Sequence, residues 1–207
     1  MNKGEKKFIC ITLIFIIILA SILIYKIKTD SQYDEELYED IYTEYEEILS
    51  IAEKNNFENI AKDNTDNKIY MHVNSQGQTY RVAGEISIPK IGISYPIIYE
   101  TTEEYLKIAP TKLFGPDINE VGNFCIVGHN YKSKKFFSKL KELEIDDRVF
   151  LMSNKGDSLT YTVYDKYEVF EDDMSPTNQN TNGNIEVTLI TCTNNKNKRL
   201  VVKCRAL

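Results

Sequence analysis

Residues 8–25 form an uninterrupted apolar run, FICITLIFIIILASILIY, with no charged side chain. A helix of this length is about the shortest that crosses a hydrocarbon layer of ~30 Å. Three lysines precede the run and two follow it, a slight excess that favours a cytoplasmic N-terminus and an external remainder. A cleaved signal peptide is the alternative, since Ala20 and Ser21 are small. No A-x-A-like site follows, however, so we expect residues 1–28 to be a cytoplasmic tail and single-pass membrane anchor.

The next part of the chain, residues 29–79, is acidic and changes character halfway. Within residues 31–55 apolar side chains recur every four positions, which predicts an amphipathic helix: Tyr33, Leu37, Ile41, Tyr45 and Leu49. This helix could lie on the following domain as a stalk or regulatory element, or it could space that domain from the membrane, the reading we favour. Residues 58–78 are polar and rich in Asn and Asp, as a linker or hairpin would be.

From residue 80 to residue 207 the pattern is that of short strands. Turn-forming residues separate seven stretches rich in β-branched or aromatic side chains: VAGEISIP, ISYPIIYE, NFCIVGH, DRVFLMS, SLTYTVYDKYEVF, IEVTLITC and RLVVKCRAL. Two brief stretches, residues 102–109 and 134–140, have helical spacing. Many strands with few helices predict a mainly β domain that closes, or nearly closes, into a barrel.

Charge and residue counts exclude two classes of function. The chain has 25 basic and 31 acidic side chains, of which five and one fall in residues 1–28, so residues 29–207 carry 20 against 30, a charge of −10. Nucleic-acid binding needs a basic face, and we therefore expect no nucleic-acid partner. The chain has two histidines and four cysteines, and no two cysteines have C-x-x-C spacing, which argues against a metal site built on Cys and His.

Three residues could perform chemistry together. Cys192 ends the stretch IEVTLITC, and a symmetric hairpin through the loop TNNKNK would place it opposite Arg199. His129 ends the stretch NFCIVGH, after a glycine that eases a bend. A nucleophile, a proton donor and a positive group are what covalent acyl transfer requires. Cys192, His129 and Arg199 are therefore candidates for these roles.

Each residue also has an ordinary structural explanation. Cys192 could be buried filler, His129 a hydrogen-bonded structural histidine and Arg199 a solvent-facing strand residue. Cys125 and Cys204 lie inside strands and fit the filler description, and a disulfide between them stays open. The acidic triplet at 171–173 could supply oxygens to calcium, although such runs are mostly solvated loops, so we expect no cofactor, with calcium as the alternative.

Taken in order, the motifs resemble those of the sortases, cysteine transpeptidases of Gram-positive bacteria. The resemblance covers about residues 82–207 and rests on GEISIPKIGISYPI at 84–97, VGH at 127–129, TLITC at 188–192 and RLVV from Arg199. It implies an eight-stranded barrel with Cys192 as nucleophile, His129 as general acid and base, and Arg199 steadying the substrate carbonyl. It also implies substrate-binding roles for Thr191 and for the loop that contains Ser175 and Pro176.

The resemblance further implies a reaction and its partners. A sorting-signal protein with an LPXTG-like motif would be cleaved between Thr and Gly, and the acyl group would pass through a thioester to an amine of a cell-wall peptidoglycan precursor. The 63 residues between His129 and Cys192 leave no room for the helix of class B enzymes, and no class C lid motif is present, which favours class A, D or E, with D preferred. A pilin-polymerising sortase, a hydrolytic cysteine protease and a non-catalytic anchored β-domain that binds cell-wall ligands are the alternatives.

Overall fold

The fold was analysed in a computed structural model, which describes residues 3–54, 62–63, 68–69, 71–75, 78–131, 135–195 and 197–207. The chain divides into two compact units, Met1–Leu37 and Tyr38–Leu207. Both predicted N-terminal helices belong to one helix, α1 (Lys3–Lys54). In the first unit, the segment Thr12–Asp30 of α1 is long and apolar enough to cross a membrane, and none of it is buried by protein.

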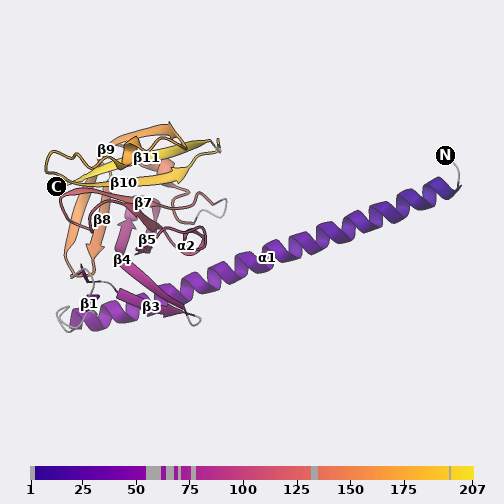
Figure 1. The fold of residues 1–207 in the computed structure, drawn as a ribbon, viewed down its shortest axis with the longest axis horizontal. Coiled ribbons are helices and arrows are strands. Elements are labelled where there is room, and N and C mark those ends of the chain that lie inside the picture. The colour runs from indigo at the N-terminus through magenta and orange to yellow at the C-terminus, as the bar shows by residue number, and fades with distance from the viewer. Residues whose placement is uncertain are drawn as a thin grey trace. The chain divides into compact units, whose positions relative to one another are not determined.

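The second unit is a closed eight-stranded barrel, which confirms the predicted fold class (Figure 1). Its strands follow one another around the barrel in the order β4 (Gln78–Ile88), β5 (Ile93–Ile98), β6 (Thr111–Phe114), β7 (Gly122–Val127), β10 (Ile185–Cys192), β11 (Lys198–Ala206), β9 (Ser158–Phe170) and β8 (Arg148–Ser153). Pairing of β8 with β4 closes the barrel and leaves no free edge at that seam. Strand β3 (Met71–Ser75) pairs with the first half of β4, and β1 (Lys62–Asp63) pairs with β2 (Lys68–Ile69).

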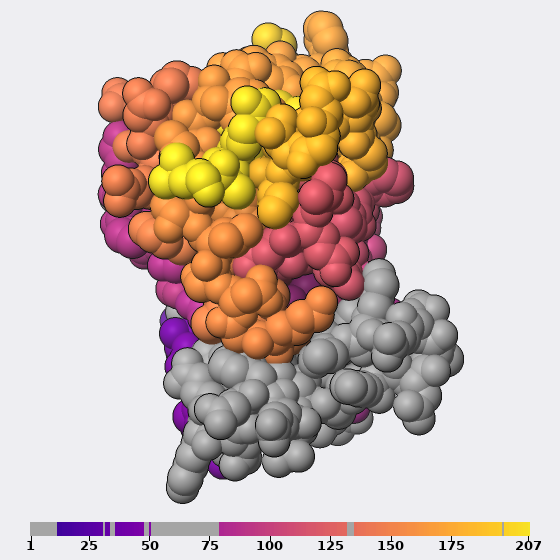
Figure 2. All heavy atoms as spheres, turned by 90° about the vertical axis from the view of Figure 1, so that its left-hand side faces the viewer, coloured from indigo at the N-terminus to yellow at the C-terminus, as the bar shows by residue number. Residues whose placement is uncertain are grey.

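Side chains along each barrel strand point alternately into the core and to the outside of the barrel, and the outward positions are available for chemistry. On β10, Val187 and Leu189 point into the core, where they join Phe124 and Ile126 of the neighbouring β7. The intervening residues of β10 therefore face outward. In the space-filling view of the barrel, the yellow C-terminal residues lie among orange residues of the β8–β9 region, as the pairing of β11 with β9 requires (Figure 2).

The segment of α1 that belongs to the second unit lies on the barrel domain. Ile41 and Tyr45, two residues of the predicted apolar stripe, are 0% and 1% exposed. The rings of Tyr38 and Tyr95 of β5 meet edge to face with centroids 5.6 Å apart. From Tyr38 onward, this packing supports the reading in which the helix lies on the domain.

Three sequence expectations differ from the structure. The helical stretch expected at 134–140 was wrong over the part that the structure describes, from residue 135 on: Phe136 lies in an isolated β-bridge, residues 137–139 form a turn, and only Leu140–Glu142 makes a 3₁₀ turn, η2. Phe136 has a φ of 51°, which an α-helix does not tolerate, and the apolar spacing instead reflects Phe136 and Phe137 packing inward from a loop. The helix expected at 102–109 is shorter, α2 (Tyr105–Ile108), and β6 was not predicted because it is four residues long.

Candidate active site

His129 lies just beyond the carboxyl end of β7, and Cys192 is the last residue of the adjacent parallel strand β10. Strands β7 and β10 are in register with Val127 opposite Ile190, so His129 and Cys192 each lie two residues farther along. The Gly128 N–H donates to the Ile190 carbonyl at 3.1 Å. This strand arrangement brings together two residues that are 63 positions apart in the sequence.

Two side chains tie these strand ends together. The hydroxyl of Thr191, which is 2% exposed, donates to the Gly128 carbonyl at 2.7 Å. The amide of Asn130 donates to the Cys192 carbonyl, also at 2.7 Å. The backbones that carry the imidazole and the thiol are thus linked by two hydrogen bonds. One joins the residues that precede His129 and Cys192, and the other joins the residue after His129 to Cys192 itself.

Arg199 lies on the other side of Cys192. The β10–β11 hairpin pairs Cys192 directly with Arg199, which confirms the register that the sequence predicted. The Arg199 guanidinium donates to the Glu171 carboxylate at 2.9 Å and to the Lys198 carbonyl at 3.1 Å. The three candidate residues therefore lie on three neighbouring strands or strand ends, with the cysteine in the middle.

The surroundings of His129 disfavour its charged form. Partial burial of the imidazole, and secondarily the positive charge of Lys107, lower the pKa of His129 below its usual value. The ring of Tyr131 lies 4.9 Å from the His129 ring, centroid to centroid. The imidazole is therefore mostly neutral at pH 7 in the absence of substrate.

A pocket opens beside Cys192. Its volume is about 270 Å³, and its wall includes Asn130, Phe137, Ser138, Lys141, Glu168, Thr191, Cys192, Thr193, Asn194, Asn195, Lys198 and Leu200. Lys198 and Glu168 form an ion pair across 3.2 Å at its rim. The thiol of Cys192 is partly exposed, so a ligand in this pocket can reach it.

The thiols of Cys125 and Cys204 are less reactive than the thiol of Cys192. Cys125 and Cys204 are both buried free thiols, with no disulfide between them. Cys125 is level with Thr188, whose neighbour on β11 is Lys203, so Cys125 and Cys204 point to opposite faces of the sheet. Burial raises the pKa of Cys125 to about 12 and also raises the pKa of Cys204.

The loop before β10 holds the other two predicted substrate-binding residues. Pro176 is buried, and its carbonyl accepts a hydrogen bond from the Asn123 amide at 2.8 Å. The Ser175 backbone N–H donates to Asp173 at 2.8 Å. Neither residue lines the pocket beside Cys192, so the structure brings Thr191, but not Ser175 or Pro176, to the cysteine pocket.

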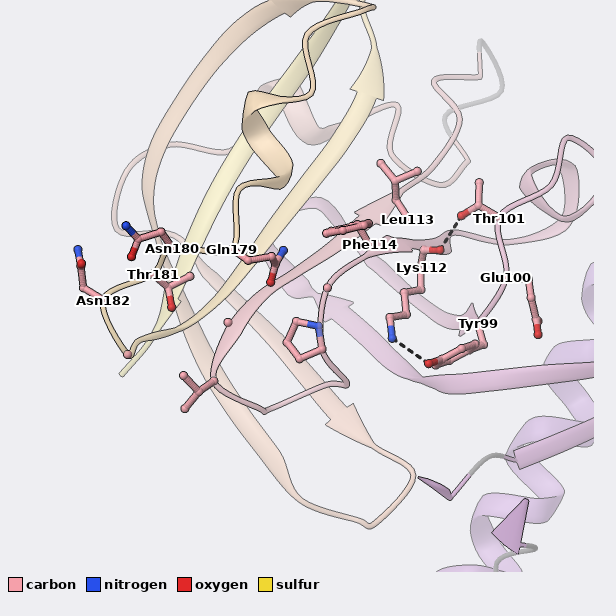
Figure 3. Close-up of a pocket in the computed structure, with 15 residues that line it drawn as sticks. Tyr99, Glu100, Thr101, Lys112, Leu113, Phe114, Gln179, Asn180, Thr181 and Asn182 are labelled. Carbon is pink, nitrogen blue, oxygen red and sulfur yellow. Dashed lines mark hydrogen bonds between the residues drawn. The ribbon is translucent and has the colours of Figure 1, made fainter. Parts of the chain in front are cut away.

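A second, larger cavity of about 1020 Å³ lies away from Cys192 (Figure 3). Gln179 to Asn182 form one side, Tyr99 to Thr101 the other, and Lys112 to Phe114 of β6 lie between them. The Lys112 ammonium is buried and donates to the Tyr99 hydroxyl and to Asp117, each at 3.1 Å. The Lys112 ammonium is thus already paired, and the lining of this cavity holds none of Cys192, His129 and Arg199.

The acidic triplet does not assemble a metal site in the described part of the chain. Glu171 pairs with Arg199, and Asp173 accepts a backbone hydrogen bond from Ser175. Among the residues searched, no group of three or more His, Cys, Asp or Glu side chains comes together. Glu171 and Asp173 thus each have a partner within the protein.

Sequence reasoning missed two polar residues at the site, Asn130 and Glu168. Asn130 follows His129 directly, and a polar residue immediately after a strand-end histidine was the available signal. Glu168 lies on a strand that alternates in exposure, and only the pairing of β9 with β11, which sets Glu168 opposite Leu200, brings it near Cys192. Nothing in the sequence pattern gave that proximity.

Comparison with known proteins identifies the family. A family model described as a sortase domain matches residues 86–207. Sortase A of Bacillus anthracis is 30% identical over 131 residues, which are 59% of this chain and 58% of that protein, so the chain spans less than two thirds of this relative. A Clostridium perfringens sortase D5 transpeptidase structure is 25% identical with a TM-score of 0.56 over 61% of this chain and 79% of its own. Sortase C-1 from Actinomyces oris is 29% identical with a TM-score of 0.55 over 60% and 73%. The chain therefore belongs to the sortase family of cysteine transpeptidases.

Proposed function

We propose that this protein is a membrane-anchored cysteine transpeptidase that cleaves an LPXTG-like sorting signal between Thr and Gly and transfers the acyl group to a cell-wall amine. The observation that carries the proposal is the position of Cys192, with His129 beyond the end of one neighbouring strand and Arg199 opposite on the other. A partly exposed thiol on a strand that lies between the strands of a proton donor and a cation is suited to acyl transfer.

The first half-reaction forms a thioester. The Cys192 thiolate attacks the threonine carbonyl carbon, and the electron pair of the C=O bond moves onto oxygen, where the Arg199 guanidinium stabilises the charge. Collapse of this intermediate breaks the C–N bond, and the His129 imidazolium gives its proton to the departing glycine amine. In this scheme Arg199 releases the Glu171 carboxylate when the substrate binds and donates to the substrate oxygen instead.

The second half-reaction regenerates the enzyme. An acceptor amine attacks the thioester carbonyl and gives its proton to neutral His129, and the C–S bond breaks to release thiolate and a new amide. Glu168, Lys141 and Lys198 line the pocket beside Cys192. This mixed charge suits an acceptor that carries a carboxylate as well as an amine, as a peptide of a cell-wall precursor does.

The lowered pKa of His129 has a kinetic consequence. The reactive form needs a thiolate and an imidazolium together, whereas the environment of His129 favours the neutral imidazole. Only part of the enzyme is then in the reactive form at neutral pH. We expect slow turnover with a bell-shaped pH profile.

The apolar segment of α1 supports anchoring of the enzyme at the cell membrane. Thr12–Asp30 is long and apolar enough to span the bilayer once. In this proposal the N-terminus is cytoplasmic and the barrel lies outside, because slightly more lysines precede the apolar run than follow it. Sorting signals and cell-wall amines are met on that side. The curated relative is a sortase A, and the solved structures carry class D and class C names. We propose class A, D or E, with D preferred, because the sequence has no class C lid motif and no room for the class B helix.

The proposal is tested by mass spectrometry of the acyl-enzyme. The full-length protein in detergent is incubated with LPXTG-type peptides, with and without an amine such as diaminopimelate or triglycine. We expect an adduct on Cys192, and an amide product only when an amine is present. Cys192→Ala should lose adduct and product, while Cys125→Ala should keep both. Turnover by Cys192→Ala would overturn the mechanism, and release of free acid at the same rate with or without amine would make the protein a hydrolase.

A further inference from the structure

The loop that follows His129 is closed at its far end by Phe136. The Phe137 N–H donates to the His129 carbonyl at 3.1 Å, and Asn130 pairs with Phe136 in an isolated antiparallel bridge. Phe136 has a φ of 51°, a conformation that is strained for a non-glycine residue and persists only when its surroundings enforce it. The positions of the described loop ends, residues 128–131 and 135–137, therefore depend on the side chains that pack around Phe136.

Rings from two other elements enclose Phe136. Its side chain is 2% exposed, and its backbone N–H donates to the Tyr95 hydroxyl at 3.3 Å. The Phe136 ring meets Tyr95 at 5.3 Å and Tyr38 of α1 at 6.0 Å, both edge to face with interplanar angles of 72°. Aromatic pairs of this geometry are favourable beyond the burial of their apolar area. Tyr38 therefore helps to hold Phe136 in its strained conformation.

The same ring connects onward to the histidine. Tyr131 lies 5.7 Å from Phe136 and 4.9 Å from His129, centroid to centroid. Four rings thus form a continuous series from the helix to the imidazole, in the order Tyr38, Phe136, Tyr131 and His129. Each step is a direct contact between side chains within the barrel unit.

We propose that Tyr38 of α1 is a positioning residue for His129, acting through Phe136 and Tyr131. The proposal rests on the proposed role of His129 as acid and base. An imidazole that must give a proton to one amine and take a proton from another depends on its orientation, and small displacements of a catalytic group lower the rate strongly. The helix before the barrel is then a working part of the enzyme, and its removal would cost activity without removing any of Cys192, His129 and Arg199.

The test compares Tyr38→Leu with Tyr38→Phe in the full-length protein. Leucine keeps apolar volume but removes the ring, and we expect kcat to fall about tenfold with KM changed less than about twofold. Phenylalanine keeps the ring and should retain at least about half of kcat. Tyr33→Ala on the same helix, where the side chain is 52% exposed, should leave kcat unchanged. Val149→Ala, in the barrel core and away from these rings, controls for lost stability.

A second readout does not need activity. The chain has only two histidines, so selective ¹⁵N labelling of histidine gives the signals of two imidazole rings, and the ring of His72 is the internal reference. Tyr38→Leu should move the His129 signals, and Tyr38→Phe should leave them in place. If the natural protein shows no turnover, the proposed function fails while this measurement still tests the ring series. Unchanged His129 signals and kcat in folded Tyr38→Leu, equal losses in Tyr38→Phe, or the same fall of kcat in Val149→Ala would each overturn the inference.

Discussion

The Arg199 guanidinium, directly across the hairpin from Cys192, is held by the Glu171 carboxylate at 2.9 Å. Glu171 is half exposed, so the ion pair adds little stability, on the order of 1 kcal/mol or less. Its importance lies in charge. A carboxylate on the guanidinium reduces the positive potential that Arg199 can offer to a developing oxyanion, and a substrate has to replace it.

Glu171→Gln should therefore raise kcat/KM by about twofold to threefold, because the amide keeps the shape of the side chain but removes the competing charge.

Arg199→Ala should lower turnover by ~10²-fold, the range for loss of an oxyanion donor. Both are measured as initial rates with a fluorogenic sorting-signal peptide. Glu120→Gln, whose carboxylate pairs with Lys155 instead, is the matched control. A fall of more than about threefold in Glu171→Gln would show that Glu171 orients Arg199 productively.

Lys107→Gln should raise the pKa of His129. Burial is the main cause of the lowered pKa, and the charge of Lys107 adds to it, so removal of that charge moves the pKa part of the way back up. The acidic limb of the pH profile should shift to higher pH. Because the reactive form needs a protonated His129, the maximum of kcat/KM should also rise, by roughly twofold to fivefold.

The measurement is a pH–rate profile together with an NMR titration of the His129 imidazole. Lys155→Gln makes the same charge change at the turn between β8 and β9 and should leave both unchanged. A titration midpoint that falls or stays fixed in Lys107→Gln would contradict the assignment of Lys107 as a cause.

Thiol reagents should modify Cys192 before Cys125 and Cys204. Cys192 is partly exposed in its pocket, while the other two are buried with raised pKa values, and only the thiolate is nucleophilic. Labelling of the folded protein with iodoacetamide, followed by peptide mapping, should give at least about tenfold faster modification at Cys192. Cys192→Ser should remove the fast phase. Equal rates at Cys125 would show that the barrel opens on the labelling timescale.

The sequence predicted the parts of the molecule that depend on local pattern. Seven strands, the β10–β11 register and the opposition of Cys192 and Arg199 follow from period-two alternation and a short polar loop. The parallel pairing of β7 with β10, which brings His129 level with Cys192, joins segments 63 residues apart, and only the family resemblance implied it.

Tertiary packing explains the parts that could not be predicted. The spacing of Phe136, Phe137 and Leu140 imitates a helix, yet Phe136 adopts a positive φ because Tyr38 and Tyr95 surround its ring. The partners of Arg199 and of Thr191 likewise come from segments that no local signal places nearby. Contacts of this kind depend on how the barrel closes rather than on any window of sequence.

Thr191→Val tests whether the threonine before the cysteine acts on the substrate or on the strand ends. Its buried hydroxyl donates to the Gly128 carbonyl, next to His129, so valine keeps the shape but breaks the tie between the two strands. Loss of a buried hydrogen bond should lower the free energy of unfolding by about 1–3 kcal/mol. Since the hydroxyl is already engaged, kcat should fall while KM stays within about twofold.

Thr191→Ser is the matched control for this change. Serine keeps the hydroxyl and loses one buried methyl group, which should destabilise the protein by about 1 kcal/mol through packing alone. Urea unfolding and steady-state kinetics on both variants separate the two effects. If the serine variant is destabilised like the valine variant but keeps its kcat, the hydroxyl aligns the histidine and cysteine strands. A rise in KM confined to the valine variant would instead place Thr191 in contact with the sorting signal.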